Sequence, residues 1–239
     1  MATRITDISK IAVFDVESTG IKPLEDRIVQ AFIGVLRRGG GFTEEHQWFI
    51  DPGIEIPEGA SSVHGITNER IKEIGRPDTK EAIFEVAQRL DILVRQGIPI
   101  VVYNAPYDLT ILAAELVRHY PGMRPVVPKY VIDPMVIDKA IDKYRKGKRT
   151  LTTVADHYGV PVSENAHDAR EDCIMTGRLA FKLIEIANPE NTLDNMMELQ
   201  ARWKYDQAKS LEEYGKKNNK EYGDVRVDWP IWREFSANS

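Results

Sequence analysis

The chain of 239 residues contains a single cysteine, Cys173. One thiol cannot form an internal disulfide or build a cysteine-rich zinc site, and a small buried apolar side chain is the simplest role for it. The sequence also lacks a long apolar run, and its start, MATRITDISK, does not read as a signal peptide. We therefore expect no membrane association and a reducing, cytoplasmic setting.

An excess of positive charge is missing as well. Lys and Arg number 32 against 37 Asp and Glu, which gives a net charge of −5 and an isoelectric point near 5.6. No overall basic field indicates nucleic-acid binding, although a local basic strip or bound cations could supply that contact. The remaining composition, 42% hydrophobic and 29% charged, is sufficient for one sizeable core and an appendage.

The order of apolar segments predicts an α/β fold. Residues 10–16 and 27–38 read as strands, and glycines at 39–41 turn the chain into a third strand over 42–51. Residues 51–67 are rich in Pro, Gly and Ser and are interpreted as a loop. Further strands are expected over 98–105 and 129–133, and helices over 79–96, 106–120, 134–144, 151–158 and 167–187.

This order predicts a mixed five-stranded sheet, with three antiparallel strands followed by β-α-β-α, flanked by helices. The character of the chain changes after NPEN at 188–191. The tail is highly charged with mixed sign and contains three of the four tryptophans, Trp203, Trp229 and Trp232. We predict one domain over 1–187 and a mainly helical extension over 188–239 that packs on the core.

Two carboxylates stand one residue apart at the end of the first predicted strand, in FDVESTG. Side chains alternate between the faces of a strand, so Asp15 and Glu17 point the same way. Like charges about 4 Å apart repel by roughly 4 kcal/mol at an effective dielectric of about 20. Against a stability of about 5–15 kcal/mol, this repulsion requires solvent or a cation. The pair taken alone favours a solvated strand end.

Three further polar residues lie at the starts of predicted helices. Asp108 falls in the first turn after the apolar strand that ends at Tyr103, and His167 and Asp172 open the last helix of the domain. Taken alone, Asp108 is more simply a favourable first-turn Asp, His167 a capping or surface residue, and Asp172 a solvated side chain. Together with Asp15 and Glu17 they converge in an α/β fold, where hard cations such as Mg²⁺ or Mn²⁺ are natural partners of clustered carboxylates. The residues thus indicate metal-dependent phosphoryl chemistry.

Three segments resemble known motifs. FDVESTG, YNAPYDLTIL and HDARED resemble, in order, the three motifs of the DnaQ-like, DEDDh-type 3′→5′ exonuclease family, and H-x-A-x-x-D is typical of its histidine subclass. SSVHGIT, at 61–67, is similar to a segment of the family's DNA-proofreading branch, the epsilon type of DNA polymerase III. The resemblance covers residues 10 to about 187. Tyr103 and Tyr107 stand where the second motif commonly has His and Phe.

The resemblance implies a ribonuclease-H-like fold and the removal of mononucleotides from 3′ ends with two Mg²⁺ or Mn²⁺ ions. Carried over to this sequence, Asp15 would bridge both ions. Glu17 and Asp172 would complete the site of the ion that activates water, and Asp108 would hold the second ion. His167 would be the general base.

The resemblance also implies residues that contact the substrate. Ser18 and Thr19 would lie beside the terminal nucleotide. His64 and Gly65 would line its base and sugar. Asn104 would contact the substrate or steady its loop.

These features predict an exonuclease that acts on single-stranded or frayed DNA 3′ ends, releases nucleoside 5′-monophosphates and serves proofreading, repair or replication. An alternative is an RNA-trimming or oligoribonuclease-type enzyme, and VHGIT favours DNA. An alternative of another class is a non-catalytic nucleic-acid-binding or polymerase-tethering module. The extension over 188–239 could be a polymerase contact, a lid or a dimer surface, and the oligomeric state stays open.

The densest basic run of the chain lies before the third motif. A solvated face is the usual reason for such a run, and a path for a single-stranded backbone is the other. The sequence leaves both readings open. The run comprises Lys139, Lys143, Arg145, Lys146, Lys148 and Arg149.

Overall fold

A computed structural model describes residues 3–162, 169–187, 191–222 and 225–236. Its five-stranded sheet has the order β3-β2-β1-β4-β5. The first three strands are antiparallel, and β4 and β5 run parallel to β1, which confirms the predicted mixed sheet. The strands are β1 (Lys10–Ser18), β2 (Ile28–Arg37), β3 (Phe42–Phe49), β4 (Ile100–Val101) and β5 (Val131–Ile132).

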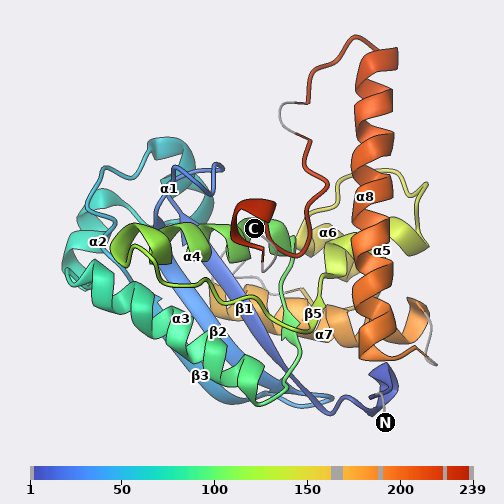
Figure 1. The fold of residues 1–239 in the computed structure, drawn as a ribbon, viewed down its shortest axis with the longest axis horizontal. Coiled ribbons are helices and arrows are strands. Elements are labelled where there is room, and N and C mark those ends of the chain that lie inside the picture. Colours follow the sequence, from blue (N-terminus) through green and yellow to red (C-terminus); the bar gives the residue numbers. More distant parts are fainter. Residues whose placement is uncertain (1–2, 163–168, 188–190, 223–224, 237–239) are drawn as a thin grey trace.

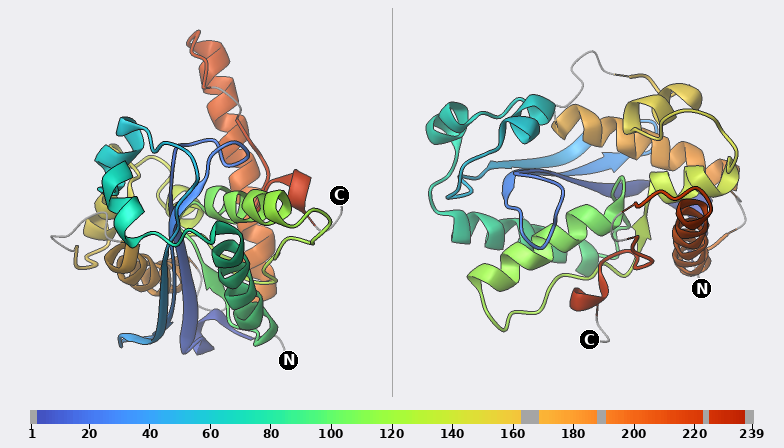
Figure 2. Two further views of the ribbon diagram at one scale, coloured as in Figure 1. Left: turned by 90° about the vertical axis from the view of Figure 1, so that its left-hand side faces the viewer. Right: turned by 90° about the horizontal axis from the view of Figure 1, so that it is seen from above.

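Helices cover both faces of this sheet (Figures 1 and 2). α3 and α4 lie on one face, and α7 lies on the other. None of the described helices combines the length and apolar character needed to cross a membrane. The helices are α1 (Glu58–His64), α2 (Asn68–Ile74), α3 (Thr79–Arg95), α4 (Ala105–His119), α5 (Pro134–Ile141), α6 (Leu151–His157), α7 (Ala169–Ala187) and α8 (Leu193–Lys217), with short 3₁₀ helices at Ile5–Asp7 and Arg233–Phe235.

The expected loop over residues 51–67 contains α1, so that expectation was wrong in part. The residue before the helix is Pro57, whose fixed φ suits a helix entry. The helix ends at Gly65, which adopts a left-handed φ of 73° that favours glycine. The proline and glycine that suggested a loop instead mark the two ends of a short helix.

The two faces of β1 join different apolar clusters. Phe14 and Val16 pack with α3 and α4, whereas Ile11 and Val13 pack with α7. Because strand side chains alternate, Asp15 and Glu17 follow Ile11 and Val13 onto the α7 face. The charged end of the strand therefore faces the helix that contains the third motif.

α7 packs closely on the sheet at Gly177. A β-carbon added there would lie 2.5 Å from a methyl carbon of Leu36 and 3.0 Å from one of Val13. A larger side chain would push the helix away from β1 and β2. The glycine therefore keeps the helix that begins with the third motif close to the strand that ends with the first.

The C-terminal segment lies against the domain. α8 runs beside α5, where the Gln207 side chain donates to the carbonyl of Val136 at 2.9 Å, and its C-terminal half projects beyond the sheet (Figures 1 and 2). Past α8, Ile231 is buried in the cluster formed by α3 and α4. The Trp232 amide donates to Thr110 Oγ1 of α4 at 3.1 Å. The domain boundary near residue 187 stays a prediction.

Candidate active site

The first two motifs meet at the C-terminal end of β1. β4 pairs with β1 only at Ala12 and Val13, so the edge beyond them is open to other partners. There the Val16 amide donates to Asp108 Oδ1 at 3.0 Å. Asp108 lies in the first turn of α4, where the helix dipole favours a carboxylate, and its side chain is only 4% exposed. One hydrogen bond thus joins the second motif to the first.

Three elements contribute carboxylates to this place. Burial raises the pKa of Asp15 well above its usual range, and repulsion from Asp108, Glu17 and Asp172 raises it further. Burial, followed by repulsion from Asp172, raises the pKa of Glu17 to about 7. Asp15, Glu17 and Asp172 are half-buried. Asp15 is therefore close enough to each of the other three predicted metal ligands to be repelled by it.

Three carboxylates of this cluster, Asp15, Glu17 and Asp108, receive little compensating positive charge from the described part of the protein. Burial raises the pKa of Asp108, and the Val16 amide opposes that rise only in part. In the described ranges, none of Asp15, Glu17 and Asp108 forms an ion pair with a basic side chain. A divalent cation would supply the missing charge, and clustered carboxylate oxygens are the ligands that Mg²⁺ and Mn²⁺ prefer. The donor set therefore fits such ions.

The side chains do not already form a cage. Across the described part of the chain, no group of three or more His, Cys, Asp or Glu side chains is arranged so that it could hold a metal ion as it stands. Mutual repulsion is a physical reason for carboxylates to stay apart until a cation offsets it. A bound cation would have to draw them together. His167, the predicted general base, lies outside the described residues.

Ser18 and Thr19 are buried, and both hydroxyls bond within the chain. Ser18 Oγ lies 2.8 Å from the carbonyl oxygen of Gly20, and both groups are within hydrogen-bond distance of the Tyr107 hydroxyl, so that the two hydroxyl protons are shared among the three oxygens. Thr19 Oγ1 donates to Asp26 at 3.1 Å. Burial is the main reason that the pKa of Tyr107 rises to about 12, so this tyrosine stays protonated at neutral pH. These bonds fix the loop after β1, and the substrate contacts of Ser18 and Thr19 stay predictions.

His64 ends α1 beside the first motif. Its Nδ1 accepts a hydrogen bond from the Ile66 amide at 3.1 Å, so its proton is on Nε2. Burial lowers the pKa of His64, and the backbone of Ser18 partly offsets that effect. The ring is therefore neutral at pH 7 and lies against Ser18. The structure brings the VHGIT segment, with Gly65, to the end of β1.

Comparison with known proteins identifies the family. Residues 12–180 match the RNase_T family model, which is described as Exonuclease. The chain belongs to the RNase_T exonuclease family. It is similar to the PolC-type DNA polymerase III of Streptococcus mutans, with 27% identity over 191 residues that cover 80% of this chain and 12% of that protein. The corresponding polymerase of Pediococcus pentosaceus is 27% identical over 178 residues, covering 74% of this chain and 12% of that protein.

Solved structures share the fold of this exonuclease. The nuclease domain of 3′hExo, a DEDDh family member bound to rAMP, has a TM-score of 0.59 at 15% identity and covers 77% of this chain and 96% of that one. Exonuclease I of Methylocaldum szegediense has a TM-score of 0.61 at 18% identity, covering 84% and 45%. Exonuclease X in complex with 5′ overhanging duplex DNA has a TM-score of 0.53 at 16% identity, covering 80% and 99%. The predicted ribonuclease-H-like fold is confirmed. The family match makes the chain an exonuclease, and the 3′→5′ direction stays a prediction.

Asn104 lies in the turn of the exonuclease that leads into α4. It adopts a left-handed φ of 67°, which Asn tolerates better than most residues. The backbone amide of Asn104 donates to Asp133 Oδ1 and that of Ala105 donates to Asp133 Oδ2, each at 3.0 Å. The backbone of Asn104 therefore steadies the second motif. Contact between its side chain and a substrate stays a prediction.

Asp133 was not among the predicted site residues. It is fully buried, and the amides of Met135 and Val136 also donate to it. Two residues of the C-terminal segment complete its surroundings: the Trp229 indole donates to Oδ2 at 3.3 Å, and Gln200 Oε1 accepts from the Asp133 amide at 2.7 Å. An Asp directly before a proline is a helix-start signal that the sequence offered. The distant partners could not be foreseen from it.

Proposed function

We propose that this exonuclease hydrolyses phosphodiester bonds at the 3′ ends of single-stranded DNA and releases nucleoside 5′-monophosphates with two divalent cations, Mg²⁺ or Mn²⁺. The observation that supports this most is the group of carboxylates from β1, α4 and α7 that repel one another, of which Asp15, Glu17 and Asp108 form no ion pair with a basic side chain in the described part of the chain. Such a group is destabilising unless it binds cations. The family match and the order of the motifs agree with this proposal.

The cations would be held by Asp15, Glu17, Asp108 and Asp172. Two cations in such a site activate a water molecule and stabilise the leaving oxygen. The residues of the chain would hold the loop beside the site in place and accept the proton of the attacking water. The bonds between Ser18, Tyr107 and Gly20 keep the loop after β1 in place beside the cluster. His167 is proposed to accept the proton of the attacking water, because histidine titrates near neutrality.

DNA is the preferred substrate of this proposal. The similar PolC-type proteins are DNA polymerases, and Exonuclease X was solved with DNA. A proofreading role beside a polymerase in the cytoplasm follows if those likenesses extend to this chain, which spans about 12% of the length of the curated relatives. RNA is the second candidate, because the nuclease domain of 3′hExo was solved with rAMP.

The test uses single strands of DNA and RNA that match in sequence and are labelled at the 5′ end. With Mg²⁺ we expect a descending ladder on DNA, which chelator abolishes and Mn²⁺ restores. Asp15→Asn should abolish the ladder, whereas Asp206→Asn, an exposed carboxylate on α8, should leave it unchanged. A ladder on RNA alone would support the second candidate. The absence of metal-dependent turnover on both would overturn the proposal and revive a non-catalytic binding module.

A further inference from the structure

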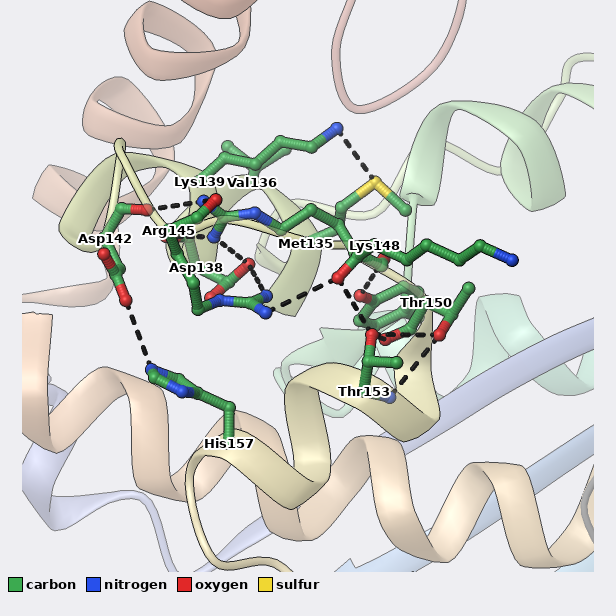
Figure 3. Close-up of polar contacts among 12 residues, drawn as sticks. Met135, Val136, Asp138, Lys139, Asp142, Arg145, Lys148, Thr150, Thr153 and His157 are labelled. Carbon is green, nitrogen blue, oxygen red and sulfur yellow. Dashed lines mark hydrogen bonds and ion pairs between the residues drawn. The ribbon is translucent and has the colours of Figure 1, made fainter.

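The loop between α5 and α6 uses two of its basic residues to fold itself. Arg149 Nη1 donates to Oδ2 of the fully buried Asp138 at 2.6 Å, and Arg145 Nη2 donates to the same oxygen at 3.2 Å (Figure 3). Arg149 Nη2 also donates to the carbonyl of Asp142 at 2.5 Å. A buried carboxylate thus holds both arginines under the loop, so neither is available to a ligand.

The other basic residues of this loop point to solvent. Lys143, Lys146 and Lys148 are exposed, and none of them forms an ion pair in the described part of the chain. Tyr144, between them, is 86% exposed, with the Lys143 ammonium 5.8 Å from its ring centre. Exposing an aromatic ring to this extent has no structural benefit. These four residues are referred to below as the lysine–tyrosine loop.

Both ends of this loop lead back to the active site. At one end, Tyr103 of the second motif donates its hydroxyl to the carbonyl of Arg149 at 2.6 Å. At the other end, α5 begins directly after Asp133, which binds the amides of Asn104 and Ala105. An α-helix of this length spans about 12 Å. The loop therefore stands a short and fixed distance from the turn that presents Asp108.

We propose that the lysine–tyrosine loop binds the single strand whose 3′ end occupies the active site, several nucleotides from that end. Lysines at 143, 146 and 148 would contact successive phosphates, and a base would stack on Tyr144. Lysines along a path and an exposed aromatic ring are the two elements that bind single strands without sequence preference. A polyanion is the occupant that fits, because the loop is a local basic patch on a chain with net charge −5. This inference rests on the proposed function.

The first test measures binding without turnover. In an Asp15→Asn background, the Kd of a fluorescent single strand is followed against salt concentration. Because each phosphate contact on a single strand contributes about 0.7 to the slope of log K against log salt, the variant Lys143→Gln/Lys146→Gln/Lys148→Gln should lower the slope by about 2. Tyr144→Ala should weaken binding by about tenfold while leaving the slope unchanged. Thermal melts check that each variant is folded.

The matched control removes three exposed cations elsewhere, in the variant Lys10→Gln/Arg178→Gln/Lys182→Gln. Lys10 begins β1 at the end remote from the carboxylates, Arg178 is at the middle of α7, and Lys182 lies beyond it. This control should keep the wild-type slope. An equal loss in both triple variants would show a general charge effect and overturn the proposal. An unchanged slope in the loop variant would also overturn the proposal. An acidic protein surface would then be the next binding partner to test for the loop.

The second test uses the active enzyme and the length of its substrate. On a strand of 20 nucleotides the loop variants should raise KM several-fold with kcat unchanged, and on a trinucleotide neither constant should change. A lower kcat on both lengths would mean that the loop acts through the folding of the active site, which contradicts the proposal. If the wild-type chain degrades nothing, the proposed function fails, whereas the salt slope still decides whether the loop binds a strand.

Discussion

Two groups of buried carboxylates in this molecule are treated in opposite ways. Asp138 is fully buried and is matched by Arg145 and Arg149. Asp15 and Glu17 at the end of β1 and Asp108 of α4 repel one another and form no ion pair with a basic side chain in the described part of the chain. Burying a charge is costly unless it is paired. The group that the chain leaves uncompensated is therefore the one that stands ready for cations, and burial alone does not distinguish the two.

The largest expected effect comes from neutralising the uncompensated group. Asp15→Asn should reduce exonuclease activity by roughly 10³-fold or more, because it removes a proposed cation ligand and with it several kcal/mol of transition-state stabilisation. The same change should leave the metal-free protein as stable as before or more stable, because it relieves repulsion and the cost of burial. Activity assays and thermal melts in chelator measure both. A clear loss of stability in chelator would contradict this account of the cluster.

The compensated group should show the reverse. Asp138→Asn leaves Arg145 and Arg149 buried without their counter-charge, so we expect the free energy of unfolding to fall by about 3–5 kcal/mol. Urea unfolding measures this change. Asp142→Asn is the matched control, because its carboxylate pairs with the exposed His157 and should contribute less than about 1 kcal/mol. Equal losses in the two variants would show that Asp138 is not the stronger anchor.

The sequence was sufficient to predict which carboxylates of the uncompensated group lie together, but it was insufficient to predict the partners of Asp138. Alternation along β1 placed Asp15 and Glu17 on one face, and the first-turn position placed Asp108 at a helix start. Those are local patterns that a sequence displays directly. The fixed partners of Asp138, two arginines of a run that reads as a solvated or nucleic-acid-binding surface, depend on how a loop folds back over α5. The spacing of apolar residues along the chain does not indicate that the loop folds back in this way.

A similar limit applies to the connections of the second motif. Asp133 precedes a proline, so its role in starting α5 could have been predicted. Its bonds to Asn104 and Trp229 join residues far apart in the chain and follow only from the packed structure. Likewise, the proline and glycine around α1 resembled a loop because a seven-residue helix offers too short a pattern to recognise.

The uncompensated group should also make the stability of the protein depend on pH, because the pKa of Glu17 is raised. The pKa of Glu17 rises from its ordinary 4.5 to about 7 on folding, so between these values the folded chain binds more protons than the unfolded chain. Its contribution to stability is therefore complete below about pH 4.5 and is lost as the pH rises through about 7. Cation binding requires the ionised form and reverses the loss.

We therefore expect the difference in Tm between Mg²⁺ and chelator to be larger at pH 8 than at pH 5.5, in melts followed by circular dichroism. Glu17→Gln removes the titrating group and should reduce that pH dependence. Asp206→Asn, at an exposed position of α8, should retain it. A difference in Tm that is the same at both pH values would contradict a raised pKa in the carboxylate cluster.

The smallest expected effect concerns Asp133, a third buried carboxylate, which is compensated by hydrogen bonds in place of charges. Trp229→Phe removes one of its donors and leaves the four backbone amides, so we expect a loss of about 1 kcal/mol. Amide hydrogen exchange should accelerate at Asn104 and Ala105, because their acceptor is less firmly held. Exchange at Val16, whose amide donates to Asp108, shows whether the disturbance reaches the cluster.

The control for this variant is Trp232→Phe, which removes an indole from the same segment and keeps the backbone bond to Thr110. It should leave exchange at Asn104 and Ala105 unchanged. Acceleration at Val16 in Trp229→Phe alone would mean that the C-terminal segment steadies the uncompensated carboxylates through Asp133. Acceleration confined to Asn104 and Ala105 would mean that Asp133 does not influence the uncompensated carboxylates. Equal exchange in both variants would contradict the role of the Trp229 hydrogen bond.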